Sequence, residues 1–213
     1  MMTEYLLILL FLIFIVLSAF FAIMRILFDN TNALTLREKT ILQSKISKSK
    51  EMQQIIHLRT CKKIAEKLKL SIVEVRSEVL GNKESCLRPS RDDKYLGEID
   101  IPSDLMIDDD LKNFRCFHEI AHYILDVGSG NQVSKEYGKD RTGETKSHKE
   151  QIINFYAAAI AIPQEELLDD LATFADGTKE YDAFLEDMKK KYRQPKEMIS
   201  RRIEEVKYIN CIS

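Results

Sequence analysis

The sequence lacks the features that mark several common classes of protein. Its 213 residues carry 32 basic and 34 acidic side chains, for a formal net charge of -2, so no excess of positive charge points to nucleic acid as a direct partner. The four cysteines are scattered and form no CxxC pair. This spacing argues against a disulfide framework and favours reduced thiols in a cytosolic compartment. The chain also contains no internal repeat and no low-complexity tract.

Long hydrophobic runs are absent except for one at the start. Residues 5–24, YLLILLFLIFIVLSAFFAIM, are apolar and uncharged throughout. A helix of that length covers the roughly 30 Å hydrocarbon core of a bilayer. No lysine or arginine precedes the run, which is also longer than the apolar core of a cleaved signal peptide. Residues 1–28 are therefore predicted to be a retained single-pass transmembrane anchor.

The charges that flank this run predict its orientation. Basic side chains occur only after it, and the positive-inside rule therefore places the N-terminus outside and the C-terminal bulk of the chain in the cytoplasm. That placement agrees with the unpaired cysteines. The basic residues that follow the run are Arg25, Arg37, Lys39, Lys45, Lys48 and Lys50.

Residues 29–54 are polar and are predicted to be a juxtamembrane spacer, within which Thr35 and Glu38 have the spacing of a capping box that starts a helix. A folded domain is expected over 55–213. Its first part contains strand-like stretches at 71–79, around Cys86 and Leu87, and at 95–102.

The second part of the expected domain is dominated by helical patterns. Acidic residues at 108–110 begin a helix that should stop near Gly128 or Gly130. A polar, glycine-containing loop is expected over 129–147. A helix over 148–162, ended by Pro163, precedes further helices that reach the end of the chain. The fold class predicted is α+β, mostly helical with a small sheet.

The stretch HEIAH, His118 to His122, is the strongest chemical signal. On a helix its two histidines project from one face and can chelate a single ion. Glu119 lies about 100° round the helix from His118, where its carboxylate can take a proton from a metal-activated water without being a ligand. We therefore expect Zn²⁺, bound by His118 and His122, with Glu119 as general base.

A hydrolytic zinc site needs a third protein ligand and an open fourth position. Glu150 is favoured, because it precedes an otherwise apolar, small-residue helix, and Asn154 lies one turn further along the same face, where its amide can orient a ligand. Asp126 is interpreted as a helix cap or as a group that orients a ligand. The remaining competitors for the third ligand are Asp126 itself, Glu136, Glu144 and His148.

These segments resemble the ImmA/IrrE-type zinc metallopeptidases. FHEIAHYIL, followed after a gap by ExxxNFYAAAIAIP, is similar to the two core motifs of that family, and the likeness extends over about 55–209. The resemblance implies a zincin-like domain with zinc bound by His118, His122 and Glu150. Ala121 departs from the family pattern, in which glycine is usual. Members of the family often cleave repressor-like regulators.

The function expected is that of a membrane-anchored cytosolic zinc endopeptidase that cleaves a protein substrate. Tyr137, in the expected loop, is a candidate second donor to the developing oxyanion. One alternative is a catalytically inactive, zinc-stabilised domain that binds a partner at the membrane. Another is a tethered transcription regulator, suggested only by two segments that imitate helix-turn-helix units, 64–75 and 192–203.

Overall fold

The computed structural model of the chain describes residues 34–81, 83–104, 108–140, 147–175 and 180–210. The predicted transmembrane run at 5–24, and with it the whole anchor at 1–28, lies outside these ranges. Within them, no helix is both long and apolar enough to cross a bilayer.

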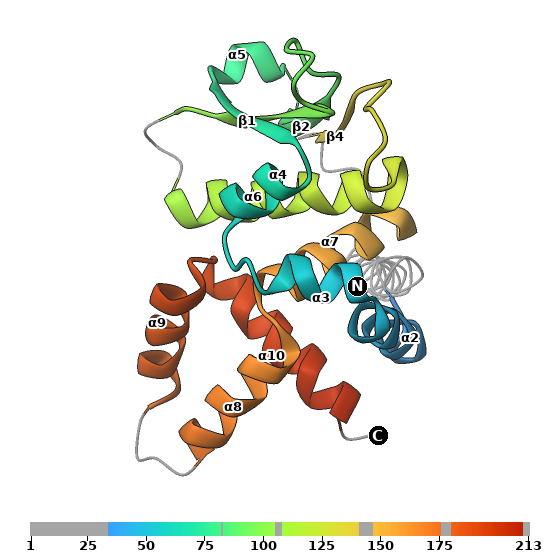
Figure 1. Cartoon of the computed structure of the whole chain (residues 1–213). Helices are drawn as coiled ribbons and strands as arrows, with labels where there is room; N and C mark the ends of the chain where they lie inside the picture. The colour runs from blue at the N-terminus through green and yellow to red at the C-terminus, as the bar shows by residue number, and fades with distance from the viewer. Residues whose placement is uncertain (1–33, 82, 105–107, 141–146, 176–179, 211–213) are drawn as a thin grey trace, which may run out of the picture.

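Helices and a small sheet make up the described part of the chain, as the α+β prediction requires. In Figure 1 the sheet lies above α6, α7 crosses the middle of the molecule, and α8, α9 and α10 form its lower part. The elements in chain order are α2 (Leu36–Lys48), α3 (Lys50–Ile56), α4 (Cys61–Lys67), β1 (Leu70–Val75), α5 (Ser77–Leu80), β2 (Lys83–Arg88), β3 (Gly97–Pro102), α6 (Asp109–His122), the π-helical turn η1 (Tyr123–Val127), β4 (Tyr137–Asp140), α7 (His148–Ala161), α8 (Gln164–Ala175), α9 (Tyr181–Tyr192) and α10 (Lys196–Asn210).

The strands form one mixed sheet in the order β1-β3-β2-β4. β1 runs parallel to β3, whereas β2 is antiparallel to both β3 and β4. The predicted strands around Cys86 and within 95–102 are confirmed as β2 and β3. The strand expected at 71–79 is β1, which ends at Val75 because the chain then turns into α5.

β4 lies within 129–147, so the prediction that this whole segment is a loop was wrong. The backbone of Tyr137 pairs with that of Leu87 in β2. Pairing with a neighbouring strand thus gives this polar stretch an extended conformation that its composition does not indicate. It also places β4 at an edge of the sheet.

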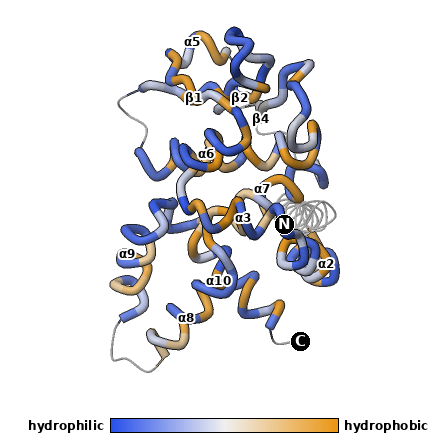
Figure 2. Tube along the Cα trace, viewed as in Figure 1, coloured by the Kyte–Doolittle hydropathy of each residue, from blue (hydrophilic) through white to orange (hydrophobic). Residues whose placement is uncertain are grey.

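α6 and α7 pack against each other below the sheet, and each begins at a side-chain cap. Asp108 accepts a hydrogen bond from the Asp110 amide at 3.0 Å, and Ser147 accepts one from the Glu150 amide at 3.2 Å. α6 continues through η1 to Gly128, whose φ of 84° suits glycine and confirms the predicted stop. α7 is largely apolar (Figure 2) and is buried over most of its length.

The predicted spacer, 29–54, requires a revision. The capping box of Thr35 and Glu38 is present and starts α2 as expected. However, Ile46 and Met52 of α2 and α3 are 1% and 5% exposed and belong to the hydrophobic core. The folded unit therefore includes α2 and α3, and it does not begin at residue 55 as the domain prediction placed it.

Neither imitation of a helix-turn-helix unit presents a second helix for reading DNA. In 64–75, α4 passes through Lys69, with a φ of 57°, directly into strand β1. In 192–203 the second helix is α10, whose Ile199, Arg202 and Ile203 are each at most 1% exposed. These side chains hold α10 in the core.

Candidate metal centre

His118 and His122 lie on one face of α6, as their spacing predicts. Their side chains are only 5% and 4% exposed, and their ring centroids are 4.9 Å apart in an edge-on arrangement. Both rings face α7, which packs closely against α6. The local helix thus supplies the pairing of the two imidazoles, and the packing of α6 on α7 supplies the third group.

That third group is Glu150, in the first turn of α7. Its carboxylate oxygens lie 3.4 Å from Nε2 of His118 and 3.6 Å from Nε2 of His122. One ligand atom from each of the three residues lies within 4.8 Å of the others. The two Nε2 atoms are buried and have no hydrogen-bond partner. Two imidazole nitrogens and a carboxylate around a common point fit a divalent metal ion with a further position left open.

The competitors for the third ligand lie elsewhere. Glu136 pairs with Lys83 and is half exposed, and the exposed His148 ring lies 3.2 Å from Glu38. Asp126 contacts the far side of the His122 ring. Glu144 lies outside the described residues.

A second set of side chains contacts the Nδ1 atoms of the two histidines, on the side of each ring opposite the centre. Asn154 Oδ1 lies 3.0 Å from Nδ1 of His118, and Asp126 Oδ2 lies 2.8 Å from Nδ1 of His122. Each contact leaves the Nε2 atom free to face the centre, which is how such partners fix the tautomer of a metal ligand. Asp126 is held in turn by Lys149, 2.8 Å away. The sequence analysis named both Asn154 and Asp126 as groups that could orient a ligand.

The π-helical turn η1 contributes to this arrangement. Asp126 follows His122 by four residues, and η1 carries its carboxylate back against the His122 ring. Such a turn inside a helix is uncommon and is often found at functional sites. Burial raises the pKa of Asp126, but the hydrogen bonds from Lys149 and His122 outweigh it, so the pKa is lowered overall and the group stays ionised.

Glu119 is fully buried beside the two histidines. Burial raises the pKa of its carboxyl group, although the His118 and His122 rings and a hydrogen bond from Ser85 act against that rise. Burial also lowers the pKa of His118, but the nearby Glu150 and Glu119 carboxylates outweigh it and the net shift is upward. The centre is therefore a place where a carboxylate can accept and release a proton closer to neutral pH than in water.

Ser85 is a residue of this centre that the sequence analysis did not name. It lies on β2, 2% exposed, and its Oγ donates a hydrogen bond of 2.6 Å to Oε1 of Glu119. The other carboxylate oxygen, Oε2, is buried without a hydrogen-bond partner. Ser85 lies between Lys83 and Cys86, where the register of β2 against β4 shifts, and three consecutive residues of β2 from Ser85 on are buried. The sequence therefore has no alternating pattern that marks Ser85, and nothing in it indicates the partner of this side chain.

Tyr137, the candidate oxyanion donor, lies on β4. Its ring centroid is 6.0 Å from that of His122, and Nζ of Lys135 lies 5.2 Å from the tyrosine ring centroid. The ring is half-buried. Pairing of β4 with β2 thus brings Tyr137 to the rim of the centre.

The comparison with known families now agrees with this geometry. Residues 107–204, which include α6 through most of α10, match the family model of the IrrE N-terminal-like domain, Peptidase M78. The match supports the ImmA/IrrE family for this part of the chain. The ImmA/IrrE resemblance is thereby confirmed, and the family is metallopeptidase-like. No curated protein and no solved structure matches the chain.

Proposed function

We propose that this chain is a zinc-dependent endopeptidase with a zincin-like fold, anchored in a membrane with its catalytic domain in the cytoplasm. The observation that carries the proposal is the convergence of His118, His122 and Glu150, whose ligand atoms lie within 4.8 Å of one another beside the buried Glu119. The match to the IrrE N-terminal-like family supports it.

The donor set fits zinc. His118 and His122 would hold the ion through Nε2 and Glu150 through its carboxylate, which is the three-ligand, open-position set of hydrolytic zinc sites. When bound there, zinc supplies Lewis-acid polarisation of a peptide carbonyl and makes hydroxide available near neutral pH.

Glu119 performs the proton transfers. Because Ser85 holds Oε1, the unpartnered Oε2 is the atom that takes a proton from the attacking water and returns it to the leaving amine. Burial raises the pKa of this carboxyl group and so brings it closer to neutral pH, where a base can also act as an acid. Tyr137, at the rim, is the proposed donor to the oxyanion.

A protein substrate and the membrane location belong to the same proposal. The apolar run at 5–24 and the basic residues after it favour a single span with the domain inside. A tether of this kind raises the effective concentration of the enzyme near substrates at the same membrane. A repressor-like regulator is the substrate class that the family resemblance suggests.

The test compares the full-length chain with Glu119→Gln in detergent. We expect about one zinc per chain in both, by metal analysis, because the substitution removes no ligand. Cleavage of a proteome-derived peptide library should fall by several orders of magnitude in the variant, since the base is lost. Zinc in both proteins without cleavage by either would favour the inactive partner-binding alternative. Absence of zinc from the wild-type chain would overturn the proposal.

A further inference from the structure

A cavity of about 540 Å³ lies between α4, β1 and α6. α6 contributes Asp109, Lys112, Asn113 and Cys116 to its wall, residues whose spacing of three and four places them on one helix face. His118 follows Cys116 by two residues and so lies about 200° further round. The cavity is therefore on the side of α6 that faces away from the metal centre.

Two cysteines from different elements meet in this cavity. Cys61, the first residue of α4, and Cys116 both line it. The Cys61 thiol donates a hydrogen bond to Oδ1 of Asn113 at 3.1 Å, and Cys116 lies one turn along α6 from Asn113 on the same face. The two thiols thus come from positions 55 residues apart in the sequence, and the packing of α4 on α6 brings them together.

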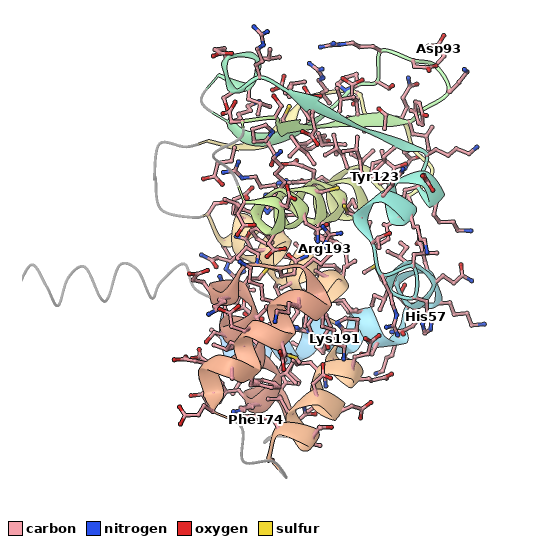
Figure 3. The ribbon with its side chains drawn as sticks, turned by 90° about the vertical axis from the view of Figure 1, so that its left-hand side faces the viewer. His57, Asp93, Tyr123, Phe174, Lys191 and Arg193 are labelled. Atoms are coloured by element: carbon pink, nitrogen blue, oxygen red, sulfur yellow. The ribbon has the colours of Figure 1, made fainter. Side chains whose placement is uncertain are left out.

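The two sulfur atoms differ in their surroundings. Cys61 is half-buried at the cavity wall, whereas Cys116 is fully buried. The neighbouring Cys116 thiol lowers the pKa of Cys61, and the positive charge of Arg193 acts in the same direction. Arg193 also lines the cavity, and in Figure 3 it lies at the level between α6 and the lower helices. Accessible thiols with thiolate character are the ones that oxidants attack.

Cys86 provides a contrast within the same chain. It is buried in β2, with its sulfur 4.0 Å from Oδ2 of Asp100, and burial together with that carboxylate raises its pKa to about 12. A buried thiol beside a negative charge resists oxidation. Cys86 is therefore an internal reference for Cys61.

We propose that Cys61 and Cys116 form a peroxide-sensitive dithiol that closes to a disulfide between α4 and α6. The Cys61 thiolate attacks an oxygen of a hydroperoxide, the O–O bond breaks, and water or an alcohol leaves once protonated. Cys116 then attacks the sulfur of the resulting sulfenic acid. The S–O bond breaks, the hydroxyl leaves as water with the Cys116 proton, and the S–S bond forms. Two thiols lose two electrons, and one hydroperoxide is reduced.

The test treats the folded full-length chain with hydrogen peroxide, blocks the remaining thiols by alkylation and maps the peptides by mass spectrometry without reduction. We expect a linked pair of peptides containing Cys61 and Cys116, lighter by two hydrogens than their sum, while Cys86 is recovered alkylated. Because the pairing depends on the fold, the link should lose its selectivity when oxidation is carried out in denaturant.

Two variants separate the steps, after circular dichroism has confirmed that each folds. In Cys116→Ser, Cys61 should stop at the sulfenic acid, which a cyclic diketone traps. In Cys61→Ser, the buried Cys116 should remain reduced. The proposal is overturned if both thiols of the folded wild-type chain are recovered alkylated, or if Cys61 pairs mainly with another cysteine or with a second chain. None of these readouts depends on peptidase activity.

Discussion

Two buried polar clusters in this chain differ in how their polar atoms are directed. Around Arg202 the groups point outward to separate partners: its Nε donates to the Ile162 carbonyl at 3.3 Å and a terminal nitrogen donates to Gln43 at 2.8 Å, while Glu205 lies 3.6 Å away. At the metal centre, Nε2 of His118 and of His122 instead point toward a common position that the carboxylate of Glu150 also faces.

This difference separates a structural cluster from a candidate site. Both clusters are buried and carry charge, so burial and charge alone do not distinguish them. Burial lowers the pKa of Arg202 to about 10, which leaves the guanidinium charged at neutral pH and able to serve as the cation of its own cluster. At the metal centre, the imidazole nitrogens and the carboxylate converge on one point, and this arrangement suits a bound metal ion.

The largest effect is expected from a matched pair of glutamates. Glu150→Ala removes a ligand, and zinc affinity should fall by more than the roughly 10- to 100-fold that is typical when only an outer partner is lost. Glu205→Ala removes a carboxylate from the other cluster and should leave the affinity of the folded protein unchanged. Titration with zinc against a competing chelator measures both. Equal losses of zinc affinity in the two variants would mean that the two clusters do not differ in their relation to the metal.

The next effect concerns stability. Arg202→Ala leaves Gln43 and the Ile162 carbonyl without their donor and opens a cavity, so the free energy of unfolding should fall by about 3–5 kcal/mol. The control is Arg201→Ala on the same helix, because that side chain is 42% exposed and its ion pair should contribute no more than about 1 kcal/mol. Urea unfolding of the metal-free proteins tests the pair. If Arg202→Ala and Arg201→Ala lowered the free energy of unfolding by similar amounts, the cluster around Arg202 would have no special role in stability.

A smaller effect should separate the two groups that hold the histidines. Asp126→Ala removes a charged partner of His122, whereas Asn154→Ala removes a neutral partner of His118. Both should weaken zinc binding within the roughly 10- to 100-fold range, with Asp126→Ala at the upper end because a charged acceptor makes the ring a stronger ligand. The same chelator competition ranks them, and a larger loss for Asn154→Ala would contradict the order.

The grouping of the side chains that each helix contributes to the centre was predictable, because the helical repeat determines which residues share a face. His118, His122, Glu150 and Asn154 follow from spacings of four residues on two helices. The packing of α2 was not predictable, since it depends on a contact between Gln43 and Arg202, 159 residues apart. β4 was missed for a similar reason: its register with β2 orders a polar segment that has no strand pattern of its own.

The smallest effect, and the one that tests the least predictable contact, is that of Ser85. The hydrogen bond from Ser85 to Glu119 joins residues 34 positions apart and depends on the register of β2 above α6. Because Ser85 touches no metal ligand, Ser85→Ala should keep zinc. The substitution should lower kcat by about tenfold, the equivalent of one charge-assisted hydrogen bond, and should change KM little. Ser71→Ala is the control, since that hydroxyl donates its hydrogen bond to the Gly97 carbonyl on β3, away from Glu119, and the substitution should leave turnover unchanged. If Ser85→Ala raised KM and spared kcat, the hydroxyl would serve substrate binding and not the proton transfers of Glu119.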